Sequence, residues 1–140
     1  MGLIKRLWGK IREPRVISML MWLQYLSFLA GGIAALVEPP HLVLLELGPW
    51  TMSVLAGLLI FGGTVGAISA LPGIWWLERF AVVSITFAGV VYGGVVTFIE
   101  ITIPESSRVL QLSFIAAVML LQGVRWHRIW ERPYDPARTD

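Results

Sequence analysis

The residues of this sequence that could carry acid–base or metal chemistry are few and widely separated. Histidine occurs only at His41 and His127, cysteine is absent, and no serine lies beside a recognisable general base. An enzyme site needs several such groups in one place, acting as nucleophile, base and stabilising donor. No glycine-rich phosphate loop follows a strand pattern either. The sequence therefore predicts neither an enzyme, nor a metal site, nor a bound cofactor.

The elements that would have to position any site are four long apolar runs, at residues 16–37, 51–71, 80–99 and 109–124. Each is close to the ~17–25 residues that a helix needs to cross a bilayer. The charged fraction is 14%, whereas soluble domains have about 25%. A soluble chain of 140 residues could not cover four such helices with the polar sequence that remains. We therefore predict an all-α polytopic membrane protein with four transmembrane helices in one domain, residues 16–124.

Basic residues are sorted to one side of these predicted spans. If the chain crosses four times, all 11 Lys and Arg residues except Arg108 fall on the same side. The positive-inside rule then places both termini in the cytoplasm. In this topology His41 and His127 lie on opposite sides of the membrane and cannot share a site. Four glutamates accompany Arg108 on the outer side: Glu38, Glu46, Glu100 and Glu105.

The two ends of the chain carry most of the basic residues. Residues 1–15 combine apolar side chains at helical spacing with basic ones, which is typical of an amphipathic helix lying in the membrane interface. A simpler interpretation is a positively charged topology anchor. Residues 125–140 are predicted to form a basic cytoplasmic tail. The net charge of +2 gives no support for a nucleic-acid partner.

Aromatic and basic side chains near the ends of the runs are expected at the membrane interface. Because the last run is short, Arg125 and Arg128 should extend toward the headgroups. Glu78 and Arg79 follow the Pro72-Gly73 turn and are expected to form a local ion pair. The predicted interface residues are Trp8, Trp50, Trp75, Trp76, Trp126, Trp130, Lys5, Arg6, Arg79, Arg125 and Arg128.

Small residues recur at intervals of four within the spans, a pattern that lets membrane helices approach closely. Two interpretations stay open, packing within one four-helix bundle and packing between subunits. The lipid bilayer is therefore one predicted partner, and a second copy or another membrane protein is the other. The predicted packing residues are Ser27, Gly31, Ala35, Gly62, Gly66, Ala70, Gly89, Gly93, Ser113 and Ala117.

No ionisable residue lies near the middle of a predicted span, and such residues usually mark proton or ion pathways. The small multidrug transporters also have four spans, but they depend on a glutamate within the first one. Here the first span has no glutamate before Glu38 at its outer end. A small transporter or channel is therefore the least favoured function.

The chain resembles a group of small four-span membrane proteins encoded by tailed phages of actinobacteria. The resemblance rests on the short basic head, on segment 71–79 with its Pro-Gly, paired Trp and Glu-Arg, and on the Arg- and Trp-rich tail with Tyr134-Asp135-Pro136. Some members of that group are labelled holins. The resemblance implies a homo-oligomer in the host's inner membrane that permeabilises it during lysis. A non-lytic interaction protein, such as a superinfection-exclusion factor or an accessory subunit, is the alternative.

Overall fold

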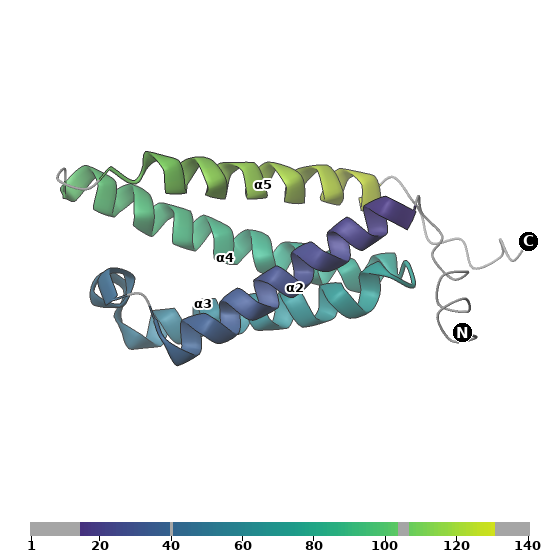
Figure 1. The fold of residues 1–140 in the computed structure, drawn as a ribbon, viewed down its shortest axis with the longest axis horizontal. Coiled ribbons are helices and arrows are strands. Elements are labelled where there is room, and N and C mark those ends of the chain that lie inside the picture. Colours follow the sequence, from purple (N-terminus) through teal and green to yellow (C-terminus); the bar gives the residue numbers. More distant parts are fainter. Residues whose placement is uncertain (1–14, 40, 104–106, 131–140) are drawn as a thin grey trace, which may run out of the picture.

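A computed structural model describes residues 15–39, 41–103 and 107–130, and these residues form helices without any strand. Each helix contains a stretch long and apolar enough to cross a membrane. The predicted all-α fold with four membrane-spanning helices is therefore confirmed, and the chain is a small integral membrane protein. The four elements, shown in Figure 1, are α2 (Arg15–Val37), α3 (His41–Ala70), α4 (Trp75–Thr102) and α5 (Val109–Trp130).

The last two helices are longer than the apolar runs that predicted them. α4 already begins at Trp75, and α5 continues through residues 125–130, which the sequence assigned to the tail. Hydropathy marks the part of a helix that lies in lipid, whereas hydrogen bonding decides where the helix ends. The predicted amphipathic segment lies almost wholly in residues 1–14, outside the described residues, as does the tail from residue 131 onward.

α3 is broken near its start. Gly48 has a φ of 73°, in the left-handed region that glycine adopts at little cost. Pro49 follows, in the first turn of the next helical segment, where a missing N–H costs nothing. The membrane-spanning part of α3 is therefore Gly48–Ala70, and the apolar residues 42–45 belong to a separate short helical segment. Figure 1 shows this segment turned out of line with the rest of α3.

Each helix packs mainly on the helix next to it in the chain. Glycines allow the backbones of α2 and α3 to approach closely. A Cβ at Gly63 would lie 2.6 Å from the backbone nitrogen of Leu29, and one at Gly32 would lie 3.0 Å from that of Ile60. The two backbones are therefore in direct contact, the arrangement that small residues permit in membranes. The α3–α4 interface also has a polar contact, because the Ser84 Oγ donates to the Leu58 carbonyl at 2.8 Å.

α5 packs mainly on α4, and less extensively than the other neighbouring helices pack on each other. Its close contacts run through side chains, because Gly89 faces Met119 and Gly93 faces Ile115. A cavity of about 260 Å³ lies among the four helices, with walls that are almost wholly apolar. The core is therefore densest between α2, α3 and the adjoining face of α4.

The predicted small-residue rows divide into an inner and an outer set. Gly62, Gly66 and Ala70 of α3 are buried against neighbouring helices, and Gly89 and Gly93 of α4 contact α5. Ala35 is half-buried. The other predicted packing residues are exposed: Ser27, Gly31, Ser113 and Ala117. On α2 it is Gly32, and not Gly31, that contacts α3.

Candidate functional site

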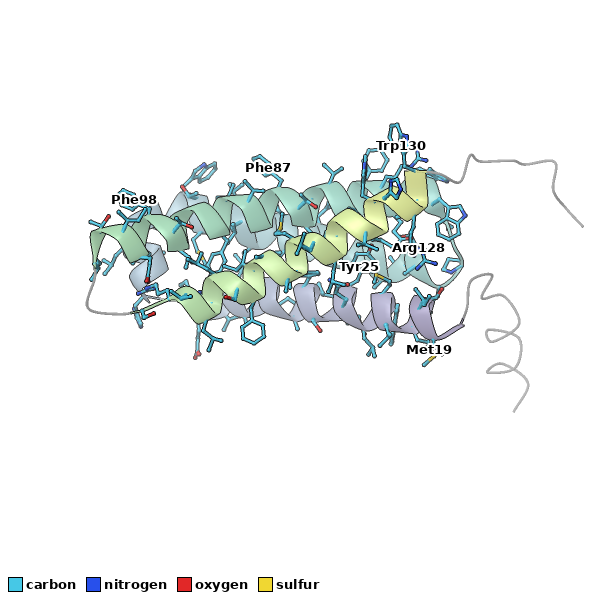
Figure 2. All side chains as sticks on the ribbon, turned by 90° about the horizontal axis from the view of Figure 1, so that it is seen from above. Met19, Tyr25, Phe87, Phe98, Arg128 and Trp130 are labelled. Carbon is cyan, nitrogen blue, oxygen red and sulfur yellow. The ribbon has the colours of Figure 1, made fainter. Side chains whose placement is uncertain are left out.

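Three polar side chains from three helices meet inside the bundle. Arg125 of α5 binds Glu78 of α4 through two contacts, Nε to Oε1 at 2.7 Å and Nη2 to Oε2 at 2.8 Å. The hydroxyl of Tyr25, on α2, donates to the same Oε1 at 2.9 Å. The three residues are 0–1% exposed. Figure 2 shows Tyr25 directed into the bundle, between α2 and α5.

The surroundings of this cluster match the charges that it buries. Glu78 lies in the first turn of α4, where the helix dipole favours a carboxylate. The guanidinium of Arg125 lies 5.4 Å from the ring centre of Trp75, within the range of a cation–π contact. The two-point Arg–carboxylate geometry is the strongest form of such a pair. The cluster thus pairs one buried carboxylate with one buried guanidinium, and the two opposite charges compensate each other.

Gly66 of α3 provides the space for Tyr25. A Cβ at Gly66 would overlap the tyrosine ring, so no larger residue fits there while the ring keeps its place. The ring then packs in a buried cluster with Ala70, Ala81 and Ile85. All four helices therefore help to position the ionic cluster, three with polar groups and α3 by its lack of a side chain.

The cluster lies near one end of the bundle, here called the Pro72 end, where α2 begins, α5 ends and the α3–α4 turn is found (Figure 1). The predicted local ion pair between Glu78 and Arg79 is wrong, because Glu78 binds Arg125 instead. Arg79 donates from Nη2 to the carbonyl of Ile129 at 3.3 Å, and its guanidinium lies 5.3 Å from the ring centre of Trp130. Arg79 thereby satisfies one of the last carbonyls of α5, which have no partner within the helix.

At the opposite end of the bundle, α4 and α5 are joined by two further hydrogen bonds. The backbone N–H of Arg108, just before α5, donates to Glu100 Oε2 at 2.6 Å. The Gln111 amide donates to the Tyr92 hydroxyl at 2.6 Å. Polar contacts therefore hold α5 to α4 near both ends, with mainly apolar contacts between them.

The predicted interface residues do not share one environment. Trp50, Trp76 and Trp130 are 57–81% exposed, whereas Trp126 is half-buried with its ring centre 5.6 Å from that of Trp130. Arg125 does not extend toward the headgroups, because its side chain turns inward to Glu78. Three further members of the set, Trp8, Lys5 and Arg6, lie outside the described residues.

The chemistry available to this site is ionic pairing across helices. In the described part of the chain, no group of three or more His, Asp or Glu residues could hold a metal ion. Sequence reasoning did not join Tyr25, Glu78 and Arg125, although the predicted topology already placed Glu78 and Arg125 at the same end of the spans. Ionisable groups buried at membrane depth pair with one another and often mark functional sites.

Comparisons of this chain with known proteins found no match. No protein-family model matches the sequence, no curated protein matches it, and no solved structure matches the fold.

Proposed function

We propose that this chain acts by helix–helix assembly in the membrane, and that its specific activity is holin-like permeabilisation of the host's inner membrane. The observation that carries the proposal is the exposure of the outer helices. Only 11% of the apolar stretch is buried inside the chain in α2 and in α5, against 33% in α3 and α4. Most of the surface of these two spans is thus left to contact lipid or other copies. We further propose that the chain is not an enzyme.

Small residues lie on these exposed spans. Ser27 and Gly31 of α2 and Ser113 and Ala117 of α5 are all exposed. Gly31 borders the cavity among the four helices, whereas Ser27, Ser113 and Ala117 line no part of that cavity. Small residues on an outer face allow a second helix to approach closely. This exposure supports contacts between copies.

A lesion through the bilayer needs polar groups along its wall, and this bundle keeps its polar groups inside. Tyr25 and Arg125 both hydrogen-bond to Glu78, and the three residues lie where α5 meets the rest of the bundle. Since the α4–α5 interface is the least extensive of the three, separation of α5 is the step that would present these groups to water. Assembly of opened copies would then line a lesion with them.

The function can be tested by expressing the chain in bacteria while recording membrane potential and viability. We expect expression to collapse the potential, and Ser27→Leu to delay or abolish the collapse. This substitution blocks an outer face of α2, because Ser27 is exposed and does not line the cavity among the four helices. Ile33→Leu, a conservative change at an exposed site of the same helix, is the control. Normal growth and an intact potential at high wild-type expression would contradict the proposal.

A non-lytic interaction protein is the second candidate. The observation that favours it is the apolar character of the outer surface, where many large hydrophobic side chains of the described spans are exposed. Such a surface suits a stable complex with another membrane protein and offers no polar wall for a pore. Crosslinking should then recover a defined partner from cells that keep their membrane potential.

The orientation of the chain gives a separate prediction. Because cysteine is absent, a single Ser106→Cys or Thr139→Cys substitution creates a unique thiol. We expect an impermeant thiol reagent to label position 106 in intact cells, and position 139 only after lysis, because the basic residues favour cytoplasmic termini. The reverse pattern would overturn the orientation.

A further inference from the structure

A groove runs along the outer surface between α4 and α5. Its volume is about 450 Å³, within the usual range of ligand pockets of about 300–1,000 Å³. Its walls are mainly apolar, and its polar lining residues are Thr86 and Gln122. The wall from α4 includes Val83 and Phe87, which are more than half exposed, so the groove opens toward the lipid. Figure 2 shows Phe87 projecting outward from α4.

A cation lies at the Pro72 end of this groove. Arg79 precedes the groove residues Val82 and Val83 by one helical turn, so it lies on the same face of α4. Its guanidinium lies over Trp130, whose ring contacts Trp126, another groove residue. The apolar groove, the tryptophan pair and the guanidinium therefore form one continuous surface.

The guanidinium of Arg79 keeps unused capacity for an anion. Its hydrogen bond to Ile129 uses one of the five donors of an arginine side chain. Nε is buried and has no hydrogen-bond partner among the described residues, so an anion would bind the remaining Nη donors. No carboxylate within the described residues pairs with Arg79. The nearest acidic neighbour in sequence, Glu78, is fully engaged by Arg125 and Tyr25.

We propose that this groove binds one anionic phospholipid, with an acyl chain between α4 and α5 and the phosphate on Arg79 beside Trp130. Guanidinium groups bind phosphate oxygens through charge-assisted hydrogen bonds. Tryptophan is favoured at the depth where headgroups meet acyl chains, which is where a span's end places Trp126 and Trp130. The site requires a negative headgroup and a chain at once, so a zwitterionic lipid fills the groove with lower affinity. A second copy of the chain would instead occupy the groove without regard to headgroup charge.

The test uses full-length protein purified in detergent and titrated with phosphatidylglycerol or phosphatidylcholine of identical chains, with bound lipid counted by native mass spectrometry. We expect a preference for phosphatidylglycerol that Arg79→Gln reduces about tenfold, the loss of one charge-assisted contact. Arg128→Gln is the matched control. It also removes a positive charge at the Pro72 end, but residue 128 does not line the groove. Figure 2 shows Arg128 and Trp130 projecting from different sides of α5.

Val83→Trp separates the groove from simple surface electrostatics. Val83 is 53% exposed, so an indole placed there fills the groove without entering the core. We expect this variant to lose the tightly bound lipid although Arg79 is intact. Arg79→Lys, which keeps the charge, should retain most of the preference. Equal effects of Arg79→Gln and Arg128→Gln, unchanged binding to Val83→Trp, or a dimer that excludes lipid from the groove would each overturn the proposal. None of these outcomes depends on membrane permeabilisation.

Discussion

Replacement of Glu78 by Ala is expected to destabilise the folded bundle by about 3–5 kcal/mol, because it removes the carboxylate that pairs with a buried arginine. Arg125 is 1% exposed and cannot reach water without moving α5. Arg125→Ala should cost a similar amount, because Glu78 would then keep only the hydroxyl of Tyr25. Tyr25→Phe removes one hydrogen bond to a charged group and should cost less, about 1.5–3 kcal/mol.

The measurement is unfolding in detergent micelles, followed by circular dichroism during a titration with a denaturing detergent. The double variant Glu78→Leu/Arg125→Met is the decisive control, because it removes both charges and keeps most of the side-chain volume. We expect it to be more stable than either single Ala variant, since apolar replacement of a buried ion pair is often neutral or stabilising. Two outcomes would show that the ion pair contributes little to the stability of the bundle. One is a Glu78→Ala variant as stable as the wild type, and the other is a double variant whose loss of stability equals the sum of the losses in the two single variants.

Gly63→Val is expected to destabilise the bundle by about 1–3 kcal/mol or more, the usual cost of overpacking. A Cβ at position 63 would lie 2.6 Å from the Leu29 nitrogen and 2.8 Å from the Tyr25 carbonyl oxygen. These are backbone atoms of a helix, so they cannot rotate away as a side chain would. α2 must move as a unit, and Tyr25 then moves away from Glu78. The variant should therefore also weaken the ionic cluster.

The same unfolding titration measures this effect, and Gly57→Ala on the same helix is its control. A Cβ at Gly57 would have no atom within 4 Å. Since alanine favours the helix over glycine by about 0.5–1 kcal/mol, this change should be neutral or slightly stabilising. Similar losses in both variants would mean that glycine at position 63 matters for helix propensity or insertion and not for contact with α2.

The four helices could be predicted from the sequence because each apolar run is close to the length that crosses a bilayer and contains no interior charge. The packing faces could be predicted only in part. Gly31 and Gly32 are neighbours, and about 100° of helix rotation separates them. At intervals of four, Gly31 is flanked by the small residues Ser27 and Ala35, whereas Gly32 is flanked by Phe28 and Leu36, so the spacing favours Gly31. The structure distinguishes them, because only Gly32 meets α3.

The ionic cluster could not be predicted because sequence distance hides which charges face each other across a bundle. Arg79 is adjacent to Glu78 in the chain, but neighbouring residues point to different sides of a helix. Arg125 is far along the sequence and follows the last apolar run, so interface extension was the expected behaviour. α5 instead remains helical through Trp130, which keeps Arg125 level with Glu78 inside the bundle.

The order of the cluster residues along the chain has a consequence for biosynthesis. Synthesis proceeds from the N-terminus, so Tyr25 enters the membrane before Glu78, and Arg125 enters last. When α4 inserts, the Tyr25 hydroxyl is the one partner from this cluster that is already present for the carboxylate. Full charge compensation begins only when α5 arrives. Completion of the last helix is therefore the step that turns a strained insertion intermediate into a stable protein.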